Sequence, residues 1–175
     1  MHLFKNDSPS YNERDHKVQQ LKLLIDSKIT RLQNPINCSS AKKFVCNVDY
    51  KGGLGYIFQH YSYCFIAALR LNRTLIFTPS TQSFLTFYIK IFFRPLSHTC
   101  VDSDGDNSTT WDGMEVTIDK TVDYQVIDFW FGRSKYLTLH AWIPTQISTE
   151  LTSLSTQPFV LFMGFLLQYL MRPSE

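Results

Sequence analysis

Apolar residues recur at helical spacing early in the chain. From Val18 they fall at positions 18, 21, 24, 25, 29 and 32, and Asn34-Pro35 ends the pattern. Residues 1–17 are polar, and we expect them to be frayed or linker-like. A single short helix with one apolar stripe is not stable alone. We therefore expect a stem helix that packs against the rest of the protein, in preference to a helix on a membrane surface.

A strand–turn–helix–strand pattern follows this helix. Residues 41–49 (AKKFVCNVD) contain a short apolar run typical of a buried strand, and residues 74–77 begin a second one. Between them, a glycine turn at 51–55 precedes a helix expected over 56–70. Its apolar positions 57, 58, 61, 64, 65, 68 and 69 form a wide stripe. This order predicts a βαβ unit with two parallel strands and helices packed on the sheet.

The remaining apolar segments are less regular. Residues 84–93 (FLTFYIKIFF) fit a helix or a strand, and Pro95 stops them. We expect an acidic, glycine-containing loop at 101–109, a strand at 124–127 and a buried helix at 158–171. That last helix is so apolar that it needs a partner surface, which the rest of the sequence barely supplies.

Composition narrows the classes of protein. The 175 residues are 44% apolar and 15% aromatic, which favours a globular domain and excludes disorder for most of the chain. The net charge of +2 is too balanced for a nucleic-acid binder that acts through bulk charge. We expect no membrane span, because no stretch reaches about 18 apolar residues. The N-terminus lacks the apolar core of a signal peptide.

Four cysteines, at positions 38, 46, 64 and 100, allow two disulfides in any of three pairings. No C-x-x-C pair is present, which argues against a zinc site. His60 and Cys64 stand at i,i+4 and would place two metal ligands on one helix face. We favour a disulfide cysteine beside a packed or exposed histidine. Formal Asn-x-Ser/Thr triplets, which fit a secretory compartment but also arise by chance, begin at Asn6, Asn37, Asn72 and Asn107.

The glycine turn is the best candidate for ligand binding. Glycines let a backbone approach a phosphate, and the N–H groups and dipole of a helix N-terminus favour an anion. The pattern G-G-x-G, from Gly52 to Gly55, matches neither a dinucleotide fingerprint nor a P-loop. On the pattern alone we therefore favour a plain tight turn, with an anion site as the alternative.

Carboxylates offer weaker candidates. The acidic loop begins like an EF-hand, but its glycine comes fourth instead of sixth, and Gly113 stands where the bidentate Glu belongs, so calcium is rejected. Asp123 and Asp128 flank a predicted strand and are expected at the surface or in a cap. No G-x-S-x-G elbow for a nucleophile is present.

Residues 32–35 (LQNP) and 38–47 (CSSAKKFVCN) form two distinctive blocks. They resemble the start of the catalytic domain in core α1,6-fucosyltransferases, Golgi enzymes that add fucose to the innermost GlcNAc of N-glycans. The similarity thins over 101–157, where WDG at 111–113 is similar to a family W-S-G. The other similar blocks are YCF at 63–65, RTLI at 73–76, FRP at 93–95 and QYLMRP at 168–173.

The resemblance implies an α/β fold, the GT-B-like first half of an open-sheet glycosyltransferase. Residues 1–36 would form the polar N-terminus and stem helix, and 37–175 the N-terminal half of the catalytic domain. It further implies the disulfides Cys38–Cys100 and Cys46–Cys64. The donor would be GDP-fucose, used without a metal or other cofactor, and the acceptor would be the N-glycan of a glycoprotein. The protein would act in the Golgi lumen. The stem helix permits a homodimer.

The family's glycine turn reads G-C-G-Y-G-C and lies beside GDP-fucose. The residues expected near the donor are therefore Gly53, Gly55, Tyr56 and Phe84, the last standing where the family has a donor-contacting Tyr. Here Gly52 and Tyr56 replace two cysteines that are bonded to each other in the family, so no orphan thiol remains. A family acceptor-side Lys aligns with Tyr50, and we expect Lys51, one residue away, to substitute for it.

No catalytic residue is identified in this chain. The family's H-V-R-R-T-D-K segment, which carries the donor-phosphate arginine, would follow shortly after Pro173, and no Arg-Arg pair occurs in the sequence. The nucleotide-binding half, the SH3-like domain and the membrane anchor are likewise not identified. We therefore expect a truncated, catalytically incomplete relative of enzymes that carry out an inverting, metal-independent transfer to the 6-hydroxyl. The alternatives are a non-catalytic, disulfide-bearing secretory binding protein and an incomplete gene model.

Overall fold

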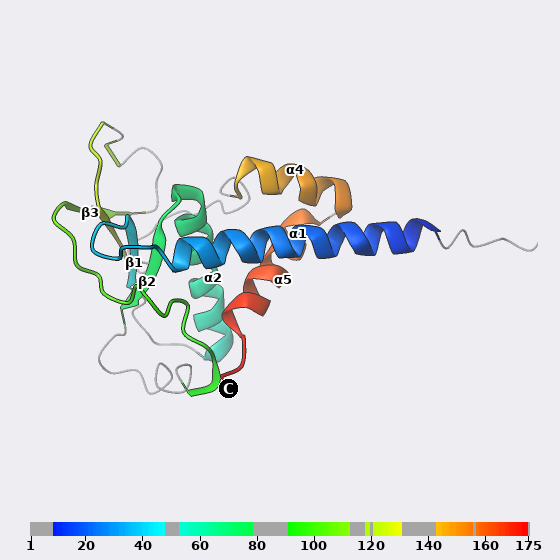
Figure 1. Cartoon of the computed structure of the whole chain (residues 1–175), viewed down its shortest axis with the longest axis horizontal. Coiled ribbons are helices and arrows are strands. Elements are labelled where there is room, and N and C mark those ends of the chain that lie inside the picture. Colours follow the sequence, from blue (N-terminus) through cyan, green and yellow to red (C-terminus); the bar gives the residue numbers. More distant parts are fainter. Residues whose placement is uncertain are drawn as a thin grey trace, which may run out of the picture.

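The computed structural model describes residues 9–47, 53–78, 91–112, 118–119, 121–130, 143–155 and 157–174. Within these ranges the fold is α/β, as expected (Figure 1). The elements in chain order are α1 (Pro9–Gln33), β1 (Lys43–Asn47), α2 (Leu54–Leu71), β2 (Thr74–Thr78), β3 (Ser108–Trp111), β4 (Val126–Trp130), α4 (Thr145–Leu154) and α5 (Pro158–Leu170).

The four described strands form one parallel sheet in the order β2-β1-β4-β3. Lys43 at the start of β1 is level with Thr74 of β2 on one side and Val126 of β4 on the other. The predicted βαβ unit is therefore confirmed, with β1 inside the sheet. The expected loop over 101–109 is wrong at its end, because β3 begins at Ser108. This strand is short and polar, so it gives little apolar signal.

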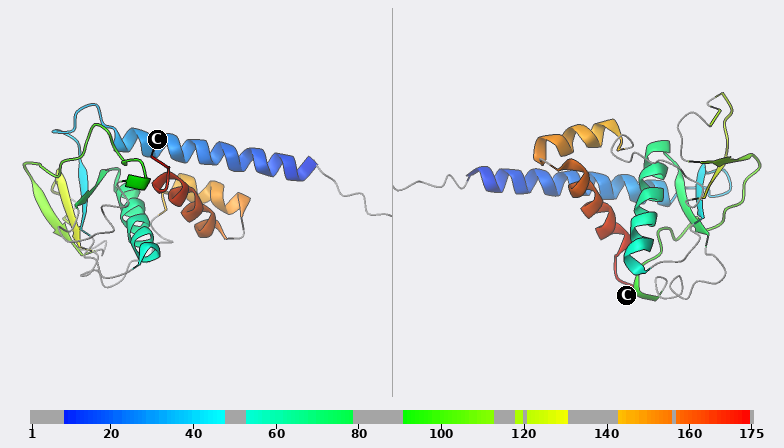
Figure 2. Two further views of the ribbon diagram at one scale, coloured as in Figure 1. Left: turned by 90° about the horizontal axis from the view of Figure 1, so that it is seen from below. Right: turned by 180° about the vertical axis from the view of Figure 1, so that it is seen from behind.

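Helices cover one face of the sheet. Figure 2 shows α2 against the strands, with α4 and α5 farther out, and the C-terminal end of α1 reaches β2. The sheet residues buried toward α2 are Phe44, Cys46, Leu75, Trp111, Ile127 and Phe129. The rings of Phe44 and Phe129 lie 5.6 Å apart, and those of Phe44 and Trp111 lie 5.9 Å apart in an edge-to-face arrangement. This aromatic group is the centre of the main core.

The start of α1 differs from the sequence expectation. The helix begins at Pro9, so the prediction that residues 1–17 are frayed is wrong for 9–17. Proline suits a first helical position, and Glu13 and Lys17 form an i,i+4 ion pair at 2.7 Å. The buried stripe runs through Leu21, Ile25 and Ile29, whereas Leu23 and Leu24 are 67% and 44% exposed. Leu24, counted in the apolar stripe of the sequence, is thus exposed instead of buried.

The C-terminal helix has a partner surface for one of its faces, whereas Val160 remains 61% exposed. Its buried residues Phe162, Phe165, Leu166, Tyr169 and Leu170 join the main core, and α5 packs against α1, α2 and α4. Helix α4 was not predicted, although its buried residues Ile147, Leu151 and Leu154 are spaced i, i+4, i+7. The sequence between these positions is polar and rich in Ser and Thr, so the apolar stripe gives only a weak helical signal. Among the described helices, none combines the length and apolarity needed to cross a bilayer.

The segment after residue 90 meets the end of the chain. Phe93 and Pro173 form an isolated antiparallel bridge, and the Arg94 N–H donates to Arg172 O at 2.8 Å. The choice between helix and strand for 84–90 lies outside the described residues.

Candidate functional site at the carboxyl edge of the sheet

The carboxyl ends of the parallel strands lie along one edge of the sheet, where open α/β folds bind their ligands. The β1 strand ends there at Asn47, and α2 begins soon after, with Gly53 as its N-cap residue. The first turn of α2 therefore lies at this edge, close to the chain's C-terminal segment (Figure 1). This is the place at which the sequence predicted an anion site.

The glycines of this turn leave room for a ligand. Gly53 is extended, with φ −74° and ψ 174°, and neither Gly53 nor Gly55 has a positive φ. A Cβ built on either glycine would meet no atom within 4 Å. Neither protein packing nor backbone conformation thus requires glycine at these two positions. The first turn of α2 also carries no acidic residue and no side-chain cap, so its positive potential is not neutralised locally.

Tyr56 and His60 stand on the next turn of α2. Tyr56 is 47% exposed, and its ring meets that of His60 edge-on at 3.7 Å between centroids, while His60 is only 4% exposed. Cys64, which shares the helix face with His60, is bonded to Cys46. A disulfide sulfur is not a thiolate ligand, so the metal pair His60–Cys64 is rejected and the disulfide reading holds.

Burial lowers the pKa of His60 below its ordinary value of 6.5. Below about pH 6.5, His60 is protonated in the unfolded chain but stays neutral in the folded one. The free energy of unfolding is therefore highest above that pH and falls as the solution is acidified. We expect the melting temperature to decrease between about pH 7.5 and 5.5. His60→Gln should flatten this slope, whereas His16→Gln, on the exposed face of α1, should leave it unchanged. A wild-type slope that persists in His60→Gln would contradict this assignment.

A polar cluster that sequence reasoning missed joins the ends of β1 and β2 to the middle of β4. Asn47 Nδ2 donates to Asp128 Oδ1 at 2.9 Å, and the Thr78 hydroxyl donates to Asn47 Oδ1. These side chains line a cavity of about 630 Å³, together with Val45, Ser103, Asp104, Gly105, Asp106, Ser108 and Val126. Carboxylate and amide oxygens accept hydrogen bonds, so the cavity suits hydroxyl or cationic groups better than phosphate. Asp128 is thus part of a shared cluster, beyond the surface or cap role expected of it.

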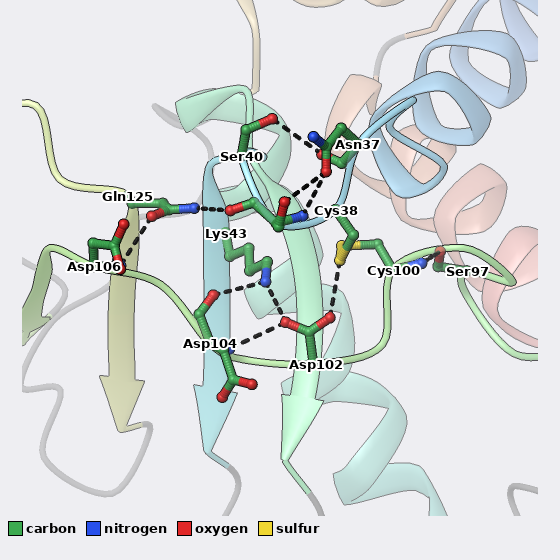
Figure 3. Close-up of polar contacts among 11 residues, drawn as sticks. Asn37, Cys38, Ser40, Lys43, Ser97, Cys100, Asp102, Asp104, Asp106 and Gln125 are labelled. Carbon is green, nitrogen blue, oxygen red and sulfur yellow. Dashed lines mark hydrogen bonds and ion pairs between the residues drawn. A yellow bond between two sulfur atoms is a disulfide. The ribbon is translucent and has the colours of Figure 1, made fainter.

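The second face of the sheet is covered by the loop Val101–Asp106, which we call the strap (Figure 3). Lys43 is fully buried beneath it; its ammonium pairs with the Asp102 carboxylate and donates to Asp104 O at 2.7 Å. The hydrogen bond from Lys43 lowers the pKa of Asp102. A Cβ on Gly105 would lie 2.5 Å from Val126 Cγ2, so only glycine permits this close crossing. The carboxylates of the rejected EF-hand therefore serve, in part, to hold the strap.

Two further ionic groups lie near the opposite, amino edge. The buried guanidinium of Arg73 donates to Tyr124 O at 2.7 Å, to Gln125 O at 3.0 Å and to Lys43 O at 3.4 Å. Asp123 is exposed, as expected, and pairs with Lys42 at 2.5 Å, whose hydrogen bond lowers the pKa of this carboxyl. Both arrangements tie the start of β1 to the segment before β4.

Both disulfides implied by the family resemblance are present. Cys38 and Cys100 join the α1–β1 connection to the start of the strap, and Cys46 and Cys64 join β1 to α2. Cys38 Sγ also lies 3.1 Å from Asp102 Oδ2, but a disulfide sulfur has no hydrogen to donate. Among the residues described, the one grouping that resembles a metal site is Cys38, Cys100 and Asp102, and the bridge excludes it.

Several predicted site residues lie outside the described ranges. Gly52 and the acceptor-side candidate Lys51 belong to the segment between β1 and α2, and Phe84 follows β2. Of the predicted donor-side group, Gly53, Gly55 and Tyr56 are therefore described, and they lie together at the start of α2.

Comparison with known proteins identifies the family. A family model described as alpha-(1,6)-fucosyltransferase N- and catalytic domains matches residues 1–175. An alpha-(1,6)-fucosyltransferase of Drosophila melanogaster is 32% identical over 168 residues, which cover 95% of this chain and 26% of that protein. One of Caenorhabditis elegans is 29% identical over 165 residues, covering 93% of this chain and 29% of that protein. The chain thus spans less than a third of the length of these relatives. It belongs to the alpha-(1,6)-fucosyltransferase family of glycosyltransferases.

Proposed function

We propose that this chain provides the N-terminal part of a catalytic domain that transfers fucose from GDP-fucose to the 6-hydroxyl of the innermost GlcNAc of an N-glycan. The transfer would be inverting and independent of metal. Within it, the α2 N-terminus at Gly53 and Gly55 would lie beside the donor diphosphate, with Tyr56 next to it. The observation that carries this proposal is the open space at both glycines, at the ligand-binding edge of the sheet.

Physical chemistry supports this placement. The first N–H groups of a helix generally lack intrahelical acceptors, although that of Tyr56 donates to Gly53 O at 3.0 Å in α2, and the helix dipole places positive potential at the same point. Without a Cβ, Gly53 and Gly55 would let a phosphate oxygen come close to those N–H groups. No carboxylate in the first turn opposes the ligand's negative charge.

The cavity under the strap lies on the sheet face opposite α2 and offers a second polar region, which reaches the carboxyl ends of β1 and β2 at Asn47 and Thr78. Its oxygen-rich lining, with Asn47 and Asp128, suits sugar hydroxyls, whereas the helix terminus suits the diphosphate. Phe84 on the donor side and Lys51 on the acceptor side remain part of the proposal. Transfer also needs a base and cations that stabilise the leaving diphosphate, and the sequence has no Arg-Arg pair. We therefore propose that these 175 residues bind GDP weakly and do not transfer fucose alone.

The test of the donor site is the substitution Gly55→Ala, measured by calorimetric titration of GDP into the full 175-residue chain. The added methyl has free space within the protein and would meet only a ligand. We expect GDP affinity to fall about tenfold, or about 1.4 kcal/mol. The fold should be retained or slightly stabilised, because Ala is favoured over Gly in a helix by about 1 kcal/mol.

Gly164→Ala provides the matched control. Gly164 is also a helical glycine with no atom within 4 Å of its missing Cβ, but it lies in α5. It should raise the melting temperature similarly and leave GDP binding unchanged. No GDP binding by the wild-type chain, or equal affinity in both variants, would refute the donor site. Fucose transfer to a glycopeptide by the purified chain would refute the expected lack of activity.

The compartment and the assembly are part of the same proposal. Two disulfides fit an oxidising compartment such as the secretory pathway, and we propose the Golgi lumen as the place of action. We also propose that α1 pairs with a second copy of the chain. The exposed Leu23 and Leu24 support this, because apolar side chains on a helix surface favour burial against a partner.

A further inference from the structure

Three Asn-x-Ser/Thr triplets fall within the described residues, and all lie at the amino edge of the sheet. Asn37 precedes β1, Asn72 precedes β2, and Asn107 precedes β3. Because the strands are parallel, this edge is opposite the glycine turn. A strand of five residues places the two edges about 15 Å apart. A large group attached at the amino edge would therefore not block the candidate site.

Asn37 has the local geometry of an accessible acceptor. Both Asn37 and Ser39 are exposed, and Ile36 beside them is fully exposed. The Ser39 N–H and hydroxyl both donate to Asn37 Oδ1, at 3.0 and 2.7 Å, in an Asx turn (Figure 3 shows Asn37 near the start of β1). Asn37 Nδ2 forms no hydrogen bond to another described residue. The two groups that define the triplet thus lie together and face solvent.

In the other two triplets, the hydroxyl-bearing residue lies in a strand of the sheet. Thr74, the third residue of the Asn72 triplet, is 3% exposed and donates its hydroxyl to Leu32 O at 2.8 Å. Thr109, the third residue of the Asn107 triplet, is half-buried and is level with Ile127 of β4 in the sheet. Asn107 itself donates to Asp123 O at 3.4 Å. Their hydroxyl-bearing residues belong to strands, whereas Ser39 belongs to a surface turn.

We propose that Asn37 is an N-glycosylation site, a proposal that rests on the secretory compartment proposed above. The donor would be an oligosaccharide linked to a lipid diphosphate. A bond forms between Asn37 Nδ2 and C1 of the donor's reducing sugar, and the bond from C1 to the diphosphate oxygen breaks. The diphosphate leaves with the bonding electron pair, and the Nδ2 proton passes to a base of the transferring enzyme. The attached glycan would project from the α1–β1 connection into solvent.

The Cys38–Cys100 bridge forms after Asn37 has become available for modification. Cys38 stands between the two residues of the triplet, and its bridge fixes the turn. The two cysteines are 62 positions apart, so the bridge closes only after Cys100 has entered the lumen. Asn37 and Ser39 are therefore presented on an unbridged chain first, and their contact is local enough to form there.

The experiment places the full chain behind a cleavable signal peptide and translates it with microsomes. Protease-protected chains are treated with peptide N-glycosidase, which converts a glycosylated Asn to Asp, and the tryptic peptide 32–42 is analysed by mass spectrometry. We expect Asp at position 37 only after the treatment. The glycan at this position should be lost in Asn37→Gln and Ser39→Ala, and kept in Ser39→Thr, which preserves the hydroxyl. Asn72→Gln, the matched amide control, should keep it.

An unmodified Asn37 in protected wild-type chains would overturn the proposal, as would a modification that survives Ser39→Ala. Alkylation of free thiols in the same sample reports whether Cys38 and Cys100 are bridged, independently of the glycan. GDP titration is a separate measurement on the purified chain. A chain that binds GDP with Asn37 unmodified would refute this inference alone, and a glycosylated chain that does not bind GDP would refute only the proposed donor site.

Discussion

Replacing both Cys38 and Cys100 with serine is expected to lower the free energy of unfolding by about 4 kcal/mol. The bridge closes a loop of 62 positions, and in the chain-entropy model the loss of so long a cross-link costs about that amount. The bridge also holds the start of the strap, beneath which Lys43 is buried. Since domains are stable by about 5–15 kcal/mol, this is a large share of the total.

The measurement is chemical denaturation of the two double-serine variants under identical conditions. The Cys46–Cys64 bridge spans only 18 positions, so its removal should cost less, about 3 kcal/mol. Equal denaturation midpoints for wild type and the Cys38/Cys100 variant would show that the cross-link does not stabilise the fold.

Arg73→Ala is expected to destabilise the fold by about 3 kcal/mol or more. Its buried guanidinium satisfies three backbone carbonyl oxygens, those of Lys43, Tyr124 and Gln125. Hydrogen bonds from a charged donor contribute about 1.5–3 kcal/mol each, and buried acceptors left without a partner add a desolvation cost. The loss should loosen the start of both β1 and β4.

Arg70→Ala is the matched control for this change. Arg70 stands in the last turn of α2, three residues before Arg73, and is exposed, so we expect a loss below about 1 kcal/mol, from the helix dipole alone. Arg73→Lys should recover only part of the loss, because one ammonium cannot reproduce the planar fork. Similar denaturation curves for the Arg70 and Arg73 variants would contradict the role assigned to Arg73.

The sequence predicts best where local pattern and tertiary packing agree. The unit β1–α2–β2 was found because its buried strands are short apolar runs and the helix has a wide apolar stripe. The end of α2 has a local cause as well: Asn72 takes the left-handed conformation, at φ 54°, and its N–H caps the last carbonyls. Of the glycine turn predicted at 51–55, Gly53 is the N-cap residue, but α2 begins at Leu54 instead of residue 56, and 51–52 lie outside the described residues.

Long-range partners explain what could not be predicted. Lys43 reads as a polar residue at the start of a strand, and only Asp102, 59 positions later, makes its full burial tolerable. Asn47, Thr78 and Asp128 are three unrelated strand residues in the sequence, and the sheet order places them side by side. Pairing across a parallel sheet leaves no local signal that sequence reasoning could use.

The position of β1 inside the sheet also bears on how the chain folds. Its neighbour β2 follows after one helix, but its other neighbour, β4, begins 83 positions after Lys43 (from 43 to 126). Pairing over such distances slows folding, since the entropy of closing the intervening loop must be overcome first. An early intermediate would therefore expose one edge of an apolar strand, to which the same strand of another molecule could add. We infer that refolding yield falls as protein concentration rises.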